Sequence, residues 1–408
     1  MAETANEDAN VEEYKALTSI LHSFFNFHQW EYEQLIKPKR IKLASLNEEE
    51  KSLLSWYPRH ISDLEMAIGI NEQFCQNMVL LMAPFWGVPA DPSKWAPTQY
   101  SNYDKVRSTL LQLMREWSDQ GIQERDVAYR KLFGELCERF PDINTRKDVK
   151  VLVPGCGLGR IIFELVKLGF WCQGNEFSYH MLVTSNYILN HCAISNSNTI
   201  FPFIHRASHV QRRLNQLAPV TIPDISTVAI QEVAEKHPEI PFGELMSMTA
   251  GSFVDLYGPE DISYSDIYTG DPMASQFRSS NKNSFDVVIT CFFIDTASNI
   301  IEYLKTIRHC LKQDGLWINF GPLLWHHEND SSTHIIKKKF SKDAPVSECL
   351  SVPQGLELSR DDLIYLVKKM GFVYEKYESN IKSTYCTDPR ALGYFMYDCE
   401  YWVCRNKL

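Results

Sequence analysis

The 408-residue chain lacks the features that mark membrane, secreted and nucleic-acid-binding proteins. It has no run of about 18 apolar residues, so we expect no membrane-spanning helix. The first residues, MAETANEDANVEEY, are acidic and polar, unlike a signal peptide. Basic residues are fewer than acidic ones, 41 against 51, and the net charge of −10 argues against a partner with a phosphate backbone.

Paired cysteines and clustered histidines are also absent. None of the 11 cysteines belongs to a CxxC pair, and the histidines have no zinc-ligand spacing, so we expect no metal site. Scattered cysteines are typical of reduced thiols and predict a cytoplasmic protein. The basic stretch 37–42, KPKRIK, would add a nuclear location if it directs import; the alternative is a solvated helix face.

What the chain does have is a nucleotide-binding pattern between Val149 and Glu176, VKVLVPGCGLGRIIFELVKLGFWCQGNE. Four segments follow one another: a buried strand over 149–153, a glycine turn over 155–159, a helix over 160–168 and a second strand over 170–174. The order of strand, glycine turn, helix, strand and acid is that of the first half of a βαβ nucleotide-binding unit.

The spacing of the glycines favours one cofactor over another. Gly155, Gly157 and Gly159 form G-x-G-x-G rather than the G-x-G-x-x-G of dinucleotide sites, which indicates S-adenosylmethionine, a ligand without a pyrophosphate. Glu176, about 20 residues further on, suits hydrogen bonds to a ribose diol. The alternative is a plain tight turn in an α/β sheet.

The remaining pattern predicts an α/β fold with a Rossmann-like, doubly wound sheet behind a helical N-terminal extension. We divide the chain into a disordered tail over 1–10, a helical region over 11–145, and an α/β domain over 146–408 with an insertion near 257–283. Further strands are expected over 285–293, 316–322, 372–377 and 401–405.

Ligands of such sheets bind at the carboxyl ends of the strands. That rule gathers the chemically interesting residues at one edge: Gly155, Gly157, Glu176, Ser252, Phe253, Cys291, Asp295 and His326.

Several of these side chains have a structural alternative. Asp295 ends an apolar strand and either faces the substrate or caps a helix beginning at Thr296. His326 follows the next strand. It either faces the site or has a purely structural role, with its ring hydrogen-bonded inside the fold. The pair Gln112 and Arg115, three residues apart, either reaches a ligand or forms a solvated helix face.

Five longer motifs carry a family resemblance: VLVPGCGLGR, QGNEFS, SMTAGSF, CFFIDTA and WINFGPLL. Together they are similar to the carnosine N-methyltransferases, and the resemblance extends from about Tyr103 to Arg405. It implies methyl transfer from S-adenosylmethionine to an imidazole nitrogen of carnosine, giving anserine. It also implies that residues 146–408 form the Rossmann-like methyltransferase domain and that the helical region over 11–145 covers the cofactor.

The resemblance also implies roles for individual residues. Those implied for the cofactor are Gln112, Arg115, Gly155, Gly157, Glu176, Ser252, Phe253 and Cys291. Those implied for the substrate are Asp295, His326, Tyr385 and Tyr397, the first two as catalytic residues that hold the imidazole. From the residues alone, the two tyrosines are as well explained by packing in an aromatic-rich tail.

The chain departs from the family pattern at three places. Cys156 replaces an alanine of the glycine turn, and Ser252 replaces an aspartate of the adenine loop, which removes a carboxylate there. The motif LLWHH leaves His326 and His327 as alternatives for one role.

Two other functions stay open on the sequence. One is a methyltransferase for another histidine-containing peptide or a protein histidine; the other is a module that binds the cofactor without catalysis. The expected partner is a small molecule, with neither nucleic acid nor membrane, and a homodimer is left open.

Overall fold

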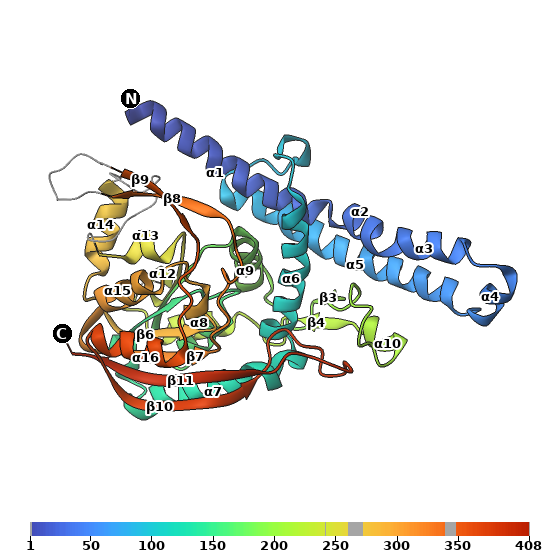
Figure 1. Ribbon diagram of the computed structural model, residues 1–408. Coiled ribbons are helices and arrows are strands. Elements are labelled where there is room, and N and C mark those ends of the chain that lie inside the picture. The colour runs from blue at the N-terminus through green and yellow to red at the C-terminus, as the bar shows by residue number, and fades with distance from the viewer. Residues whose placement is uncertain (1, 241, 260–271, 339–347, 408) are drawn as a thin grey trace.

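The computed structural model describes the whole chain except residues 1, 241, 260–271, 339–347 and 408. Its centre is a seven-stranded sheet in the order β10-β11-β7-β6-β1-β2-β5 (Figure 1). The strands are β1 (Lys150–Pro154), β2 (Trp171–Glu176), β5 (Met246–Ala250), β6 (Phe285–Cys291), β7 (Leu311–Gly321), β10 (Phe372–Ser383) and β11 (Tyr397–Asn406). The five strands from β7 to β5 are parallel, and β11 runs antiparallel to both of its neighbours. The Rossmann-like α/β fold predicted from the sequence is confirmed.

Alternation along the strands creates two hydrophobic cores, one on each face of the sheet. Val151 and Val153 of β1 pack into one core, whereas Leu152 between them packs into the other, because successive side chains of a strand point to opposite faces. The first core contains residues of α6 (Tyr100–Trp117), α7 (Ile122–Arg139), α8 (Arg160–Lys167) and α9 (Tyr179–His191). The second contains residues of α13 (Phe253–Tyr257), α15 (Ile300–Cys310) and α16 (Arg360–Lys369). Strands with both faces buried explain the continuous apolar runs of the sequence.

The N-terminal helices are α1 (Ala2–Phe25), α2 (Phe27–Glu31), the π-helical turn η1 (Tyr32–Ile36), α3 (Lys37–Ala44), α4 (Glu48–Leu53) and α5 (Tyr57–Met82). Residues of α1, α2 and the second half of α5 pack into the first core. The outer part projects as an arm (Figure 1), where η1 and the first half of α5 form a smaller core of their own. At the tip of the arm, Asn47 and Glu50 form a capping box for α4.

The disordered tail expected over 1–10 differs from the structure, in which α1 begins at Ala2. The first residues of this helix include alanines and glutamates, which are strong helix formers. Further along the chain, α4 ends at Leu53 and α5 begins at Tyr57, with Pro58 in its first turn.

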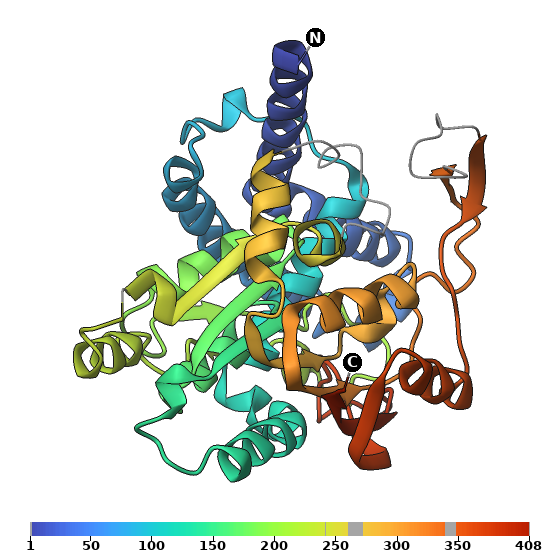
Figure 2. The same cartoon turned by 90° about the vertical axis from the view of Figure 1, so that its left-hand side faces the viewer.

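Shorter elements complete the fold. They are β3 (Asn198–Ile200), α10 (Arg213–Gln216), β4 (Val220–Ile222), α11 (Ala229–Lys236), α12 (Phe242–Leu245), α14 (Pro272–Asn281), β8 (Thr333–Lys338) and β9 (Glu348–Pro353), with short 3₁₀ turns that include η6 (Ile294–Thr296). The hairpin of β8 and β9 projects from the body (Figure 2). The middle of the insertion predicted near 257–283 lies outside the described residues, and α14 follows it. Across the described chain, no helix combines the length and apolar character that a bilayer crossing requires.

Candidate active site

A cavity of about 940 Å³ lies at the carboxyl ends of the parallel strands. It is bordered by α6, the glycine turn, the residues that follow β2, β5, β6 and β7, and the loop between β10 and β11. Ten of the predicted site residues line it: Gln112, Arg115, Gly155, Gly157, Glu176, Ser252, Phe253, Cys291, His326 and Tyr385. Asp295 and Tyr397 do not line it.

Glu176 holds the glycine turn in shape. Its carboxylate accepts the backbone N–H of Gly157 at 2.9 Å and those of Phe177 and Ser178 at 2.8 Å each. The turn itself needs glycine, because Gly155 and Gly157 have φ values of 64° and 57°. Burial raises the pKa of the Glu176 carboxyl, and the three backbone donors oppose that rise.

A second carboxylate lies at the turn, that of Glu116 in α6, which was not predicted as a site residue from the sequence. It is buried and accepts hydrogen bonds from Nε2 of Gln112 at 2.5 Å and from the backbone N–H of Arg160 at 3.3 Å. An acid is favourable there because Arg160 begins α8, and the N-terminus of a helix attracts negative charge. In the sequence, Glu116 is marked only by its position beside Arg115 on an amphipathic helix. That position does not indicate its hydrogen bond with Arg160, which is 44 residues away in the chain.

Gln112 and Arg115 are buried, with 6% and 4% of their surfaces exposed, so the interpretation as a solvated helix face is wrong. Nε of Arg115 lies 3.1 Å from a carboxylate oxygen of Glu124, and its guanidinium lies 4.4 Å from the centre of the Tyr385 ring. Within the part of the chain that the structure describes, Nε and Nη2 of Arg115 are both buried without a hydrogen bond, and Nε has only its ion pair with Glu124. A buried donor of this kind lining a cavity is suited to an anionic ligand group.

Ser252 and Phe253 lie at the start of α13. The hydroxyl of Ser252 caps this helix by accepting the backbone N–H of Asp255 at 3.3 Å. The Phe253 ring is buried edge-on against Phe293. Asp255 lines the same cavity, so this end of the site keeps a carboxylate although Ser252 supplies none. At the neighbouring strand end, burial raises the pKa of the Cys291 thiol to about 12.

Asp295 is not the cap of the following helix. α15 begins at Ile300, and its cap is Asn299, which accepts the backbone N–H of Ile301 at 3.1 Å. Asp295 instead accepts the backbone N–H of Leu324 at 3.0 Å, and its own carbonyl accepts that of His326 at 3.0 Å. The segments after β6 and β7 are therefore joined through Asp295.

The environment of Asp295 perturbs its ionisation. Only 3% of its surface is exposed. Burial raises the pKa of its carboxyl from 3.8 to about 6, against the opposing hydrogen bond from Leu324. Asp295 does not itself line the cavity, but its neighbour Thr296 and its partner His326 do. Perturbed pKa values of this kind cluster at functional sites.

The two adjacent histidines differ in place. His326 lines the cavity, and burial, with His327 beside it, lowers the pKa of its imidazole, which keeps the ring neutral near pH 7. His327 turns toward Asp330, with Nδ1 3.7 Å from a carboxylate oxygen. His326 is thus the one of the two that faces the site.

Tyr385 and Tyr397 lie in different hollows. Tyr385 lines the main cavity, whereas Tyr397 lines a shallower depression of about 420 Å³ with Leu324 and Arg360. Burial and then the charge of Asp295 raise the pKa of the Tyr397 hydroxyl. Leu324, which lines the same depression as Tyr397, donates its backbone N–H to Asp295.

A glycine turn after the first strand, an acid after the second and a cavity at their carboxyl ends define a Rossmann-like, S-adenosylmethionine-dependent methyltransferase. The family model described as carnosine N-methyltransferase matches residues 92–408. The chain belongs to the carnosine N-methyltransferase family.

Curated relatives with that name match nearly the whole chain. The carnosine N-methyltransferase of Schizosaccharomyces pombe is 34% identical, over 97% of this chain and 96% of its own. That of Mus musculus is 32% identical, over 98% and 88%. That of Dictyostelium discoideum is 33% identical, over 97% and 77%.

Proposed function

We propose that this methyltransferase transfers a methyl group from S-adenosylmethionine to an imidazole nitrogen of carnosine, yielding anserine and S-adenosylhomocysteine. The observation that carries the proposal is the buried Asp295 carboxylate, hydrogen-bonded to Leu324 and joined through its carbonyl to His326 at the cavity edge. Family membership and the names of the curated relatives support the choice of carnosine.

The residues at the other end of the cavity fit the cofactor. The buried Nη2 of Arg115 would receive the methionine carboxylate, beside Gln112. Glu176 would accept the ribose hydroxyls, because a carboxylate has more acceptor sites than its three backbone bonds occupy. Ser252 and Phe253 would border the adenine. When bound, S-adenosylmethionine supplies an electrophilic methyl group on a sulfonium.

The chain's own task is to present one imidazole nitrogen and to hold the other. A free imidazole has a pKa near 6.5 and is therefore largely neutral, and nucleophilic, at pH 7. Asp295, ionised above about pH 6, would accept the remote ring N–H, fix the tautomer and stabilise the imidazolium as it forms. Neutral His326 and the Tyr385 ring would restrict the orientation of the substrate ring.

The test is transfer of a labelled methyl group to carnosine, to free histidine and to proteins of a whole lysate, each at the same concentration of S-adenosylmethionine. We expect label in carnosine, with little in the other two, and a product whose methyl group lies on one ring nitrogen. Label that appears mainly in protein would contradict the proposal and favour a protein histidine as the acceptor. Cofactor binding without transfer to any of the three would indicate a non-catalytic module.

A further inference from the structure

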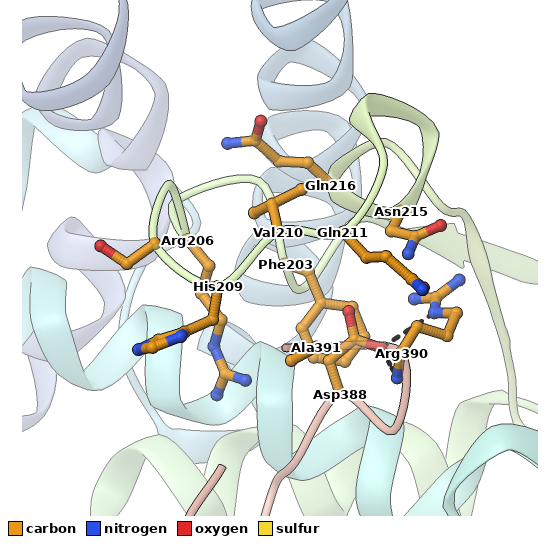
Figure 3. Close-up of a pocket in the computed structure, with 11 residues that line it drawn as sticks. Phe203, Arg206, His209, Val210, Gln211, Asn215, Gln216, Asp388, Arg390 and Ala391 are labelled. Atoms are coloured by element: carbon orange, nitrogen blue, oxygen red, sulfur yellow. Dashed lines mark hydrogen bonds and ion pairs between the residues drawn. The ribbon is translucent and has the colours of Figure 1, made fainter. Parts of the chain in front are cut away.

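The loop between β10 and β11, residues 384–396, crosses from the cavity to a distant segment of the chain. On its far side it contacts residues 203–216 (Figure 3). Nη2 of Arg206 donates to the carbonyl of Cys386 at 3.0 Å, and the backbone N–H of Leu392 donates to the carbonyl of His209 at 2.8 Å. An isolated bridge joins Val210 to Ala391. The outer part of the 384–396 loop is therefore fixed to the body.

On its near side the same loop is held by one carboxylate. Glu124, in the first turn of α7, accepts the backbone N–H of Cys386 at 2.7 Å and that of Thr387 at 3.1 Å. It also accepts the hydroxyl of Thr384 at 2.7 Å. The donors belong to residues on both sides of Tyr385, so Glu124 fixes the backbone from which the Tyr385 ring projects.

Glu124 has a further partner, Arg115, on the cofactor side. The two charged groups are 3.1 Å apart and almost wholly buried, at 9% and 5% side-chain exposure. The guanidinium of Arg115 covers the Tyr385 ring at 4.4 Å, while its Nη2 keeps no partner among the described residues. One carboxylate thus contacts both the cation proposed to bind the cofactor and the backbone around the substrate-side tyrosine.

We propose that Glu124 is a positioning residue that couples occupation of the cofactor site to the placement of Tyr385. A carboxylate bound at Nη2 would fix the orientation of Arg115, and that would strengthen the contacts of Arg115 with Glu124 and with the Tyr385 ring. Such coupling is reciprocal, so an ordered loop tightens cofactor binding as much as the cofactor orders the loop. The inference rests on the proposed cofactor site but not on the identity of the methyl acceptor.

The experiment is hydrogen exchange of the 384–396 loop with and without S-adenosylhomocysteine, whose binding is verified by calorimetry. It compares the wild type with Glu124→Gln, which keeps the size of the side chain but removes its charge. The matched control is Glu135→Gln on the same helix, whose carboxylate binds Lys376 at 2.7 Å and Arg139 at 2.8 Å, away from the loop. Thr384→Val serves as a milder second variant if Glu124→Gln does not fold.

We expect S-adenosylhomocysteine to slow exchange in the wild-type loop by about tenfold, within the usual range of coupling between sites. In Glu124→Gln the slowing should largely disappear, in Thr384→Val it should decrease, and in Glu135→Gln it should match the wild type. Equal slowing in wild type and Glu124→Gln, or none in the wild type, would overturn the inference while leaving carnosine methylation intact. Absence of S-adenosylhomocysteine binding to the wild type would overturn the cofactor site and the inference together.

Discussion

At the scale of single residues, the ionised carboxylate of Asp295 should favour activity but lower the stability of the folded protein. Its pKa in the folded protein, about 6, exceeds the ordinary 3.8, so folding favours the protonated carboxyl. The contribution of the protonated Asp295 carboxyl to the free energy of unfolding is fully present below pH 3.8. It is lost as the pH rises through about 6. At pH 7 the buried anion therefore costs at most about 3 kcal/mol.

Asp295→Asn should consequently raise the unfolding temperature at pH 7 and leave it nearly unchanged at pH 4. The amide oxygen can still accept the N–H of Leu324, but it cannot stabilise an imidazolium. Turnover should then fall by orders of magnitude, because the same change of aspartate to asparagine in a serine-protease triad lowers kcat by about 10⁴-fold. Thermal unfolding at both pH values and single-turnover methylation of carnosine provide the check. Near-normal turnover per folded molecule would exclude the catalytic role.

The pH profile of the same variant gives a second readout. In the wild type, both Asp295 and the substrate imidazole must be unprotonated, so log kcat/KM should fall with a slope approaching 2 at low pH. In Asp295→Asn only the imidazole titrates, and the slope should approach 1. Identical slopes in the two proteins would show that Asp295 does not act as an anion.

At Ser252 a substitution is expected to increase the affinity for the cofactor rather than to decrease it. Ser252→Asp preserves a good N-cap for α13 and adds the carboxylate that the family pattern has at this place. We expect tighter binding of S-adenosylmethionine, by roughly 1.5–3 kcal/mol if the new acid receives one charge-assisted hydrogen bond, with an unchanged KM for carnosine. Calorimetry decides, and unchanged or weaker affinity would indicate that Asp255 already serves the adenine.

At the scale of elements, α6 is hydrogen-bonded to the glycine turn and does not only pack against it. Nε1 of Trp117 donates to the carbonyl of Leu158 at 3.1 Å, and Glu116 accepts from the amide that begins α8. Trp117→Phe should cost about 1 kcal/mol for the lost bond plus a term for the cavity left behind. The carbonyl of Leu158 keeps one donor, the hydroxyl of Ser185 at 3.1 Å.

Because the lost bond fixes the turn, the Trp117→Phe variant should also bind S-adenosylmethionine several-fold more weakly than the wild type. Chemical denaturation and calorimetry measure the two effects separately. A loss of stability without any loss of affinity would show that α6 supports the turn only as packing. The hydroxyl variant Ser185→Ala, which contacts the same carbonyl from α9, is the natural comparison.

At the scale of the whole molecule, α1, the second half of α5 and α6 share one core with the sheet. Phe24 of α1, Met78 of α5 and Trp117 of α6 belong to the same buried cluster as Val151 and Ile289 of the strands. The two regions that the sequence suggested should therefore unfold together. Tryptophan fluorescence and far-ultraviolet circular dichroism should give coincident denaturant transitions, and two separated transitions would show that the helical region is independent.

A feature of the structure could be predicted from the sequence when the residues that determine it are close together in the chain. The path from β1 through the glycine turn to Glu176 is local, and its spacing is visible in one stretch of sequence. β11 was placed as a strand, but its reversed direction follows from the pairing with β7 and β10 and leaves no local mark. The roles of Glu116 and Glu124 depend on partners that are distant in the chain, so no spacing rule indicates them.

Asp295 shows a subtler limit. A polar residue after a strand and before a helix has two good explanations, and only the place where the helix begins separates them. Gly155 shows another: a Cβ there would lie 2.3 Å from the Phe293 ring, so a side chain would collide with the protein before it filled any ligand's space. Neither packing fact is contained in the motif.

The three backbone bonds of Glu176 have a consequence for the thermodynamics of ligand recognition. An acid that is already held by Gly157, Phe177 and Ser178 need not be immobilised when a ligand arrives. The entropy lost in ordering this side chain belongs to folding and not to association. The acceptor is preorganised, so the ligand-free protein already carries the geometry that the ribose would meet, and discrimination against sugars lacking the diol requires no induced fit.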